Sequence, residues 1–412
     1  MTPPSERSIA RPADLPPAGD LLRLPLRALL QSLLRRLQRG SLAIELPGGE
    51  WLHARGAEAG PEASLRVHRW RALRRLVMQG DLGLALAYRD GDWSSPDLTA
   101  VLMLGAANDE AWGGLMDGRG PWRALSRLWH LAHANTRRGS RHNIAFHYDL
   151  GNAFYAQWLD PSMLYSSGLY ENGTESLEQA QAAKLEAILG WLDTPPQAQV
   201  LEVGIGWGTV AATLAQRHGA RVTGLTLSRE QLVHAWNAAE DMGVASQLDL
   251  RLQDYRDVQG RYDRIVSIEM LEAVGESWWP AYFSMLRDRL APGGQAVLQA
   301  ITIGERWFSR YRRGADFIQR CIFPGGMLPT RAALRERAHA AGLVLEEGLH
   351  FGDSYALTLA TWRRRFLAAW PTIAPLGFDD RFRRLWEYYL CYCEAGFRTG
   401  RIDVGLYRLR HA

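Results

Sequence analysis

The sequence of 412 residues contains few cysteines and almost no lysine. Its three cysteines, Cys321, Cys391 and Cys393, are too few for the disulfide framework of a small secreted protein. A Cys-x-Cys pair without further Cys/His pairs is also a poor metal site, so we expect buried or bystander thiols and no bound metal. Lys184 is the one lysine among 48 basic residues.

Long apolar runs are absent as well. None reaches the roughly 18 residues that a membrane-spanning helix requires, and the polar start of the sequence lacks a signal-peptide pattern. The net charge of +4 is mild, and no block of basic residues suits nucleic acid. Positive clusters recur beside apolar segments, which suits an anionic membrane surface. We therefore expect a cytoplasmic protein, peripheral at the inner face of a membrane, without a nucleic-acid partner.

The composition is that of a folded chain long enough for two domains, with 47% apolar and 22% charged residues. Residues 1–19 are Pro-rich and polar and predict a disordered tail. Residues 20–115 mix short strand-like and helical segments, which predicts a small α+β domain for lipid-surface contact or dimerisation. A basic connector over 116–145 would then lead to a second domain over 146–412.

The segment 21–37 is amphipathic, with arginines interleaved among leucines. One interpretation is a helix that packs its apolar side on its own domain. The other is an interfacial helix resting on lipid headgroups.

The second domain alternates strand and helix patterns, as doubly wound α/β folds do. Predicted strands cover 199–204, 220–227, 248–253, 262–269, 295–303, 343–351 and 401–409, and predicted helices lie near 175–192, 208–218, 229–242, 278–290 and 330–341. Insertions at 305–329 and 356–398 would cover the carboxyl edge of the sheet, where such folds bind ligands. This predicts a seven-stranded sheet with a pocket under helical lids.

A glycine-rich turn follows the first of these strands, with Gly204, Gly206 and Gly208 at alternate positions before a helix. Glycine lets a ligand approach the main chain, because it lacks a Cβ and adopts backbone angles closed to other residues. The Gly-Lys-[Ser/Thr] of a phosphate-binding loop is absent. The turn therefore favours a nucleoside without a polyphosphate.

Nine short strings occur in collinear order from about residue 140 to the end of the chain. They are His147-Tyr-Asp-Leu-Gly-Asn152, Leu159-Asp-Pro-Ser-Met-Leu-Tyr-Ser166, 201–208, Gly224-Leu-Thr-Leu-Ser-Arg-Glu-Gln231, Gln253-Asp-Tyr-Arg-Asp257, Met270-Leu-Glu-Ala-Val-Gly275, Ile322-Phe-Pro-Gly-Gly326, Phe351-Gly-Asp-Ser-Tyr355 and Phe366-Leu-Ala-Ala-Trp370. In these strings the sequence resembles the cyclopropane-fatty-acyl-phospholipid synthases and the related mycolic acid methyltransferases. The resemblance implies a class I Rossmann-like methyltransferase domain.

The resemblance also implies an S-adenosylmethionine pocket. Its parts would be the methionine-binding turn, a loop over the sulfonium, a ribose site and an adenine site. Gly204 and Gly206 would form the methionine-binding turn, and Tyr165 and Ser166 the loop over the sulfonium. Thr226 and Gln231 would bind the ribose, and Asp254 and Tyr255 would flank the adenine. An ordinary cap after the third strand is the alternative for Asp254.

The reaction implied by the resemblance sets further requirements. An alkene in a lipid tail attacks the methyl group of a sulfonium, and the resulting carbocation needs aromatic faces and exclusion of water. A base must then remove a proton from the added methyl group. In the family this base is a bicarbonate ion held by a Cys, a Glu, a His, a Tyr and a backbone group. Glu272 and Tyr355 match the Glu and the Tyr, and Ile301 matches the backbone contributor.

Two positions depart from this set, because Ser167 replaces the Cys and Gln299 replaces the His. Serine and glutamine can still hydrogen-bond an anion, but Gln299 cannot carry a proton. Glu272 would itself become the base if burial raises its pKa. The alternative for Glu272 is a carboxylate paired with a neighbouring arginine.

We therefore predict a dimeric enzyme that forms a cyclopropane ring at the cis double bond of an unsaturated phospholipid chain. One alternative keeps the methyl transfer and leaves a methylene- or methyl-branched chain, the latter with the help of a reductant. Another is a non-catalytic lipid-surface module with a degenerate fold. Methyl transfer to a small polar molecule is disfavoured by the aromatic insertions, in which four arginines flank Trp307, Phe308 and Tyr311. That pattern suits either a lipid surface or a solvated helix face.

Overall fold

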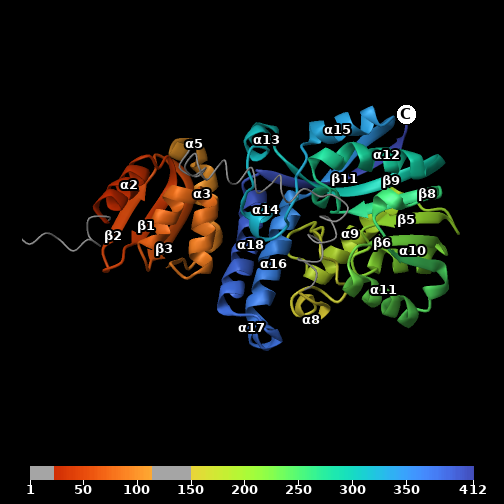
Figure 1. Ribbon diagram of the computed structural model, residues 1–412, viewed down its shortest axis with the longest axis horizontal. Coiled ribbons are helices and arrows are strands. Elements are labelled where there is room, and N and C mark those ends of the chain that lie inside the picture. The colour runs from red at the N-terminus through yellow and green to blue at the C-terminus, as the bar shows by residue number, and fades with distance from the viewer. Residues whose placement is uncertain (1–22, 114–149) are drawn as a thin grey trace, which may run out of the picture.

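The computed structural model describes residues 23–113 and 150–412 (Figure 1). The predicted tail at 1–19 and the predicted connector at 116–145 lie outside these residues. Within the two described ranges, no helix is long and apolar enough to span a membrane.

The first range, 23–113, forms a small α+β unit. Its elements are α2 (Arg23–Arg35), β1 (Arg39–Glu45), β2 (Trp51–Arg55), β3 (Glu58–Val67), α3 (Arg71–Arg89), β4 (Trp93–Ser94), α4 (Leu98–Ala107) and α5 (Asp109–Trp112). The sheet order is β2-β1-β3-β4, with β1 antiparallel to β2 and parallel to β3. Alternate residues of β1, such as Leu42 and Ile44, are buried, as the two-residue period of a strand requires. Leu30 of α2 is buried in the same core, which agrees with the packed-helix interpretation of 21–37.

The second range, 150–412, contains the larger unit. Its first half comprises α8 (Asn152–Tyr155), α9 (Leu177–Leu192), β5 (Gln199–Val203), α10 (Thr209–His218), β6 (Arg221–Thr226), α11 (Arg229–Asp241), β7 (Leu248–Leu252) and β8 (Tyr262–Ile268). Its second half comprises α12 (Trp279–Arg289), β9 (Leu290–Ile303), α13 (Glu305–Tyr311), α14 (Phe317–Cys321), α15 (Arg331–Ala340), β10 (Leu343–His350), α16 (Gly352–Ala368), α17 (Trp370–Ile373), α18 (Asp380–Arg398) and β11 (Ile402–His411). Short 3-10 turns lie at Ala245–Gln247, Tyr255–Asp257, Leu271–Ala273, Glu276–Trp278 and Ala374–Leu376.

Seven strands form one sheet in the order β10-β11-β9-β8-β5-β6-β7. The central strands are parallel, whereas β11 is antiparallel to both β9 and β10. Successive strand residues face opposite sides, so that Val200 lies in the core beside α9 and α10 and Leu201 in the core beside α12 and α15. Helices thus cover both faces of the central parallel strands, as the prediction of a doubly wound fold required.

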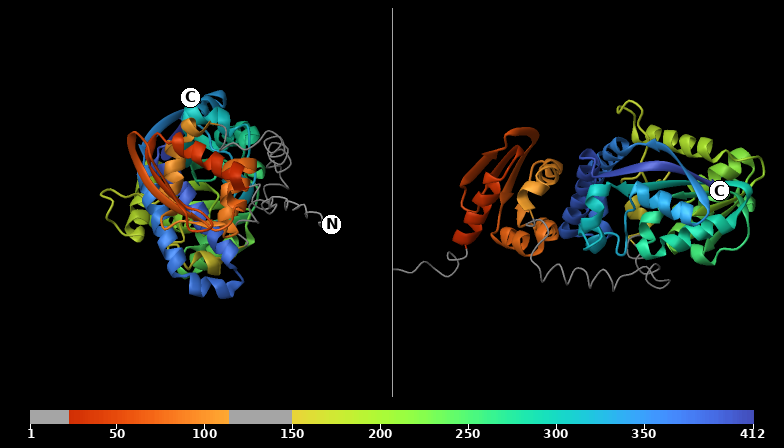
Figure 2. Two further views of the ribbon diagram at one scale, coloured as in Figure 1. Left: turned by 90° about the vertical axis from the view of Figure 1, so that its left-hand side faces the viewer. Right: turned by 90° about the horizontal axis from the view of Figure 1, so that it is seen from above.

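The two insertions lie together between the sheet and the small unit. Figure 1 shows α16 and α18 standing between the orange N-terminal unit and the sheet, and Figure 2 shows the same order from above. Helix α18 packs against α16 on one side and against α3 and α4 on the other. Hydrogen bonds tie the units together: Thr99 donates to Glu394 over 3.0 Å in a buried contact, and Tyr88 donates to Glu387 over 2.9 Å in a partly buried one.

The seven strands predicted in the second domain agree with the observed ones to within two residues, except that β9 begins five residues before the predicted 295. In the small unit, the sequence predicts strands at 42–46 and 65–70; the observed β1 and β3 overlap them, although β3 begins earlier, at Glu58, and β2 and β4 are not predicted. Strand β2 lies at the sheet edge, where exposed residues alternate with half-buried ones over only five positions and none is fully buried, so its apolar signal is weak. Strand β4 has only two residues, too few for any periodic signal.

Candidate active site

A cavity of about 620 Å³ lies at the carboxyl ends of β5, β6 and β8, under α13, α14, α16 and α18. All residues predicted to bind the cofactor line it: Tyr165, Ser166, Gly204, Gly206, Thr226, Gln231, Asp254 and Tyr255. Glu272, Ile301 and Tyr355 line it too. Ser167 and Gln299 are buried behind its wall and reach it through Glu269, a residue that was not predicted. The pocket under two helical insertions is thus observed.

The glycine turn between β5 and α10 leaves room for a ligand. Gly206 has a φ of 52°, and a Cβ there would meet no atom within 4 Å. Gly208, at φ 93°, serves packing instead, because a Cβ would lie 2.7 Å from the Cβ of Ala235 on α11. At the end of β5, Glu202 lines the cavity, and its buried Oε2 has no hydrogen-bond partner in the described part of the chain. Burial raises the pKa of Glu202 to about 8. Open space beside an unsatisfied acceptor fits the amino-acid end of S-adenosylmethionine.

The predicted ribose site is formed by two side chains that bind each other. The Thr226 hydroxyl and the Gln231 carbonyl oxygen lie 2.9 Å apart at the end of β6, and both side chains are buried. Ser228 caps α11 by accepting from the backbone N–H of Gln231. This pairing orients the Gln231 amide, whose NH2 group can donate to a ligand hydroxyl.

The predicted adenine site includes a buried ion pair. Arg256 Nη2 lies 2.6 Å from Asp254 Oδ2, and both side chains are almost fully buried. The guanidinium of Arg256 also covers the rings of Trp278 and Tyr255, at 4.5 and 5.4 Å from their centroids. Asp254 in addition caps the turn Tyr255–Asp257, which was the alternative interpretation of this residue. A role of Asp254 and Tyr255 beside adenine stays a prediction.

The loop predicted to cover the sulfonium is fixed from behind by a lysine. Lys184 of α9 is 1% exposed, and its Nζ donates to Ser166 Oγ over 2.7 Å. Burial lowers the pKa of Lys184 to about 8. The neighbouring Tyr165 hydroxyl lies 2.7 Å from the hydroxyl of Tyr389 on α18. Sequence reasoning gave Lys184 no role, although its status as the one lysine among 48 basic residues was a signal.

Glu269 occupies the place predicted for bicarbonate. Its Oε1 accepts from the backbone N–H of Ser167 over 3.0 Å and from Gln299 Nε2 over 2.6 Å. Its Oε2 accepts from the Tyr355 hydroxyl over 2.6 Å. The Ser167 hydroxyl points elsewhere and donates to the carbonyl of Gly168. These donors are taken by a carboxylate of the chain and do not fit a bicarbonate ion, so that prediction is corrected.

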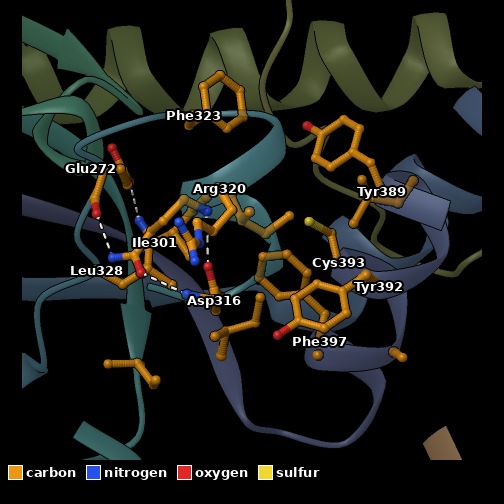
Figure 3. Close-up of a pocket in the computed structure, with 18 of the residues that line it drawn as sticks. Glu272, Ile301, Asp316, Arg320, Phe323, Leu328, Tyr389, Tyr392, Cys393 and Phe397 are labelled. Atoms are coloured by element: carbon orange, nitrogen blue, oxygen red, sulfur yellow. Dashed lines mark hydrogen bonds between the residues drawn. The ribbon is translucent and has the colours of Figure 1, made fainter. Parts of the chain in front are cut away.

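A second carboxyl group, that of Glu272, also lines the cavity but has fewer hydrogen-bond donors than Glu269. Its Oε1 accepts from the backbone N–H of Ile301, and its buried Oε2 has no partner among the described residues (Figure 3). Burial and the charge of Glu269 raise the pKa of Glu272 to about 8. Burial also raises the pKa of Glu269, but the hydrogen bonds from Tyr355 and Ser167 and the charge of Lys184 oppose this. Glu272 is therefore mostly protonated at neutral pH, whereas Glu269 has three hydrogen-bond donors and the charge of Lys184 to favour its ionised form. The predicted alternative for Glu272, an arginine partner, is not found in the described ranges.

The backbone at Glu269 is strained. Its φ of 49° lies in the left-handed region, which a residue with a long side chain rarely adopts. The turn is held because Glu269 N–H donates to the carbonyl of Gln299 over 2.8 Å. Strain of this kind persists where the surrounding structure fixes it, and it is common at functional sites. Sequence reasoning chose Glu272 from its motif; the signal for Glu269 was its place at the end of a predicted strand.

Aromatic side chains of the lid helices form the wall opposite these carboxyl groups. Figure 3 shows Tyr389, Tyr392 and Phe397 of α18 on the side of the pocket away from Glu272 and Ile301. The rings of Tyr355 and Phe397 lie 4.5 Å apart. Such faces stabilise a positive charge on a bound ligand while they exclude water.

Known proteins with similar sequences are lipid-modifying enzymes. The tuberculostearic acid methyltransferase UfaA1 of Mycobacterium tuberculosis is 37% identical, over 94% of this chain and 93% of its own length. The cyclopropane-fatty-acyl-phospholipid synthase of Escherichia coli is 33% identical, over 83% of this chain and 86% of its own length. Among solved structures, the mycolic acid cyclopropane synthase CmaA1, crystallised with SAH and CTAB, is 30% identical. It superposes with a TM-score of 0.60 over 65% of this chain and 97% of its own.

The family model described as mycolic acid cyclopropane synthetase matches residues 135–406. This range includes six strands of the seven-stranded sheet and the first half of β11, together with the glycine turn, both carboxyl groups and both lid insertions. The α/β fold is that of S-adenosylmethionine-dependent methyltransferases, and S-adenosylmethionine is accordingly the cofactor. The chain belongs to the mycolic acid cyclopropane synthetase family.

Proposed function

We propose that the protein transfers a methyl group from S-adenosylmethionine to the cis double bond of an unsaturated acyl chain in a membrane phospholipid. One observation carries the proposal: the carboxyl group of Glu269, half-buried and held by three donors, lies in a cavity that joins the cofactor-binding turn to an aromatic wall. A base in a dry, aromatic chamber suits a reaction that forms a carbocation and then loses a proton. A polar methyl acceptor would not need such a chamber.

The residues of the pocket have separable tasks in this reaction. When bound, S-adenosylmethionine supplies an electrophilic methyl group, which the alkene attacks. Glu202 and the glycine turn would hold its amino-acid end, and Thr226 with Gln231 its ribose. Tyr389 and Phe397 shield the carbon that becomes cationic. Glu269 accepts the proton that leaves the added methyl group.

Glu269 suits the role of base better than Glu272 does. Its carboxylate receives three hydrogen bonds, which favour the ionised form that can accept a proton. Glu272 has one donor, from Ile301, and a pKa of about 8, so little of it is ionised at neutral pH. Because Glu272 is mostly protonated, it does not add a second negative charge beside Glu269.

The product depends on where the cation lies when the proton leaves. If the cation is on the neighbouring olefin carbon, loss of the methyl proton closes a cyclopropane ring. If a hydride first shifts from the methylated carbon to that neighbour, the same proton loss leaves an exocyclic methylene group. Both routes need only Glu269 as base and no oxidant or reductant.

We place the methylene-branched product first. The donors expected to hold bicarbonate bind a side-chain carboxylate here, and the 37% identical relative is named for methyl transfer rather than for ring formation. The cyclopropane product is the second candidate, favoured by the 33% identical synthase. A saturated methyl branch would need a separate reductant.

Incubation with a dioleoyl phospholipid and methyl-labelled cofactor tests the proposal. We expect label in the acyl chain, found by mass spectrometry after the lipid is hydrolysed. Proton NMR separates the products, since ring methylene protons resonate upfield of other chain protons and exocyclic methylene protons in the olefinic region. Label only in the headgroup, or no label with any unsaturated lipid, would reject olefin methylation.

A further inference from the structure

The cavity does not end at the catalytic unit. It continues past α18 into the N-terminal unit, where residues from α2, β1, β3, α3, β4 and α4 line it. Most of this lining is aliphatic: Leu30, Leu34, Leu42, Ile44, Leu65 and Leu76. Protein interiors are normally packed to the density of organic crystals, so an open apolar space through a small domain is unusual. It indicates room kept for an apolar ligand.

Glycines in two of the helices around this space leave room in it. Helix α3 is broken at Gly80, whose φ of 65° and ψ of −140° are not helical. On α4, Gly105 lines the cavity, and a Cβ there would meet no atom within 4 Å. Leu104 beside it is buried in the core of the unit. A larger residue at position 105 would fit the helix and enter the open space.

Charged groups separate the two apolar parts of the cavity. Asp109, the first residue of α5, lies 2.8 Å from Arg310 of α13 and 2.5 Å from Arg401 before β11. Asp316 and Arg320 line the same region, and Figure 3 shows them between the Glu272–Ile301 wall and the aromatic residues of α18. A single hydrocarbon chain running through this region would desolvate these charges without compensation. A lipid with polar groups at its middle and apolar tails on both sides would not.

We propose that the N-terminal part of the cavity binds the second acyl chain of a two-chain phospholipid. The first chain then lies beside Glu269, and the ester and phosphate groups lie at the charged junction formed by Asp109, Arg310 and Arg401. The identity of the first chain as the methylated one rests on the proposed function. The small unit thereby selects intact diacyl lipids over single-chain lipids.

The variant Gly105→Trp fills the N-terminal part of the cavity, far from the reacting groups. We expect it to lower kcat/KM for a dioleoyl phospholipid about tenfold, equivalent to losing the burial of about two methylene groups. Activity on an oleoyl lysophospholipid in the same mixed micelles should stay unchanged. Gly190→Trp, at an exposed glycine of α9 whose Cβ would also meet no atom within 4 Å, is the matched control. An equal loss on both lipids, or no loss on either, would overturn the proposal.

Photolabelling tests the site without turnover and without a variant. A phosphatidylglycerol with a diazirine in its second chain is bound to the wild-type protein, irradiated and mapped by peptide mass spectrometry. We expect crosslinks on β3 or α4, which a free diazirine fatty acid gives less often. Crosslinks confined to α16 and α18 would overturn the second-chain site. Crosslinks on α4 without any olefin methylation would leave this site standing and remove the proposed function.

Discussion

The cofactor side and the base side of the cavity are built in different ways. On the cofactor side, Thr226 and Gln231 are five residues apart and bind each other at one strand end. On the base side, Glu269 collects donors from Ser167, Gln299 and Tyr355, which come from three distant segments. Local geometry can be inferred from a short motif, whereas a network across four segments depends on how the whole sheet and lid assemble.

The two sides also differ in what a substitution should do. The ribose site on the cofactor side offers neutral hydrogen bonds, each worth about 1 kcal/mol. The base side holds Glu269, and loss of this proposed base removes a chemical step, worth roughly 10² to 10⁴ in rate. Changes at the base should therefore affect turnover, and changes at the ribose site should affect cofactor affinity.

The largest effect is expected for Glu269→Gln. The amide cannot accept the proton, so we expect turnover to fall about a thousandfold, while cofactor affinity measured by calorimetry changes little. Glu272→Gln is the matched control, because an amide resembles the protonated carboxyl that a pKa of about 8 maintains at neutral pH. A larger loss in Glu272→Gln than in Glu269→Gln would assign the base to Glu272.

Lys184→Met should have the next largest effect. It removes the donor to Ser166 and the positive charge that helps to keep Glu269 ionised. The pKa of Glu269, already raised by burial, should rise further, so the acid limb of the pH–rate profile should move to higher pH. Turnover at neutral pH should fall about tenfold, as for loss of a hydrogen bond to a charged group. A purely structural role would lower activity equally at all pH values and leave the limb in place.

Sequence reasoning placed the sheet and the cofactor side because both rest on local patterns. The alternating strand and helix segments, the glycine turn and the pair Thr226 and Gln231 each involve residues close in sequence. It missed Glu269 because nothing local shows that Gln299 and Tyr355 converge on it. It missed the continuation of the cavity into the small unit because packing voids leave no periodic signal in sequence.

Gln231→Ala should show the contrast between the two sides most directly. Removing the amide should raise the Kd for S-adenosylmethionine about tenfold, as expected for one or two lost hydrogen bonds. With saturating cofactor, turnover should stay within about twofold of wild type, because Gln231 touches no group of the base network. A large fall in saturated turnover would contradict the separation of the two sides.

The smallest effect concerns the exposed arginines around α13, at the outer rim of the pocket. Arg312 pairs with Glu276 and Arg310 with Asp109, whereas Arg306 and Arg313 are exposed and pair with no carboxylate in the described part of the chain. We expect these two arginines to attract anionic vesicles, worth about 1 kcal/mol each at low salt. Activity on such vesicles should fall severalfold as salt rises, because ions screen surface charges.

The double variant Arg306→Gln/Arg313→Gln tests this surface at low salt. Its activity on anionic vesicles should match that of the wild type at high salt, and activity on neutral detergent micelles should not change. Arg221→Gln, at an exposed arginine of β6 far from α13, is the matched control and should retain the salt dependence. Because screening acts on exposed charges and hardly on the buried groups around Glu269, cofactor affinity should stay constant throughout. A salt-dependent loss on neutral micelles would place the effect inside the pocket instead.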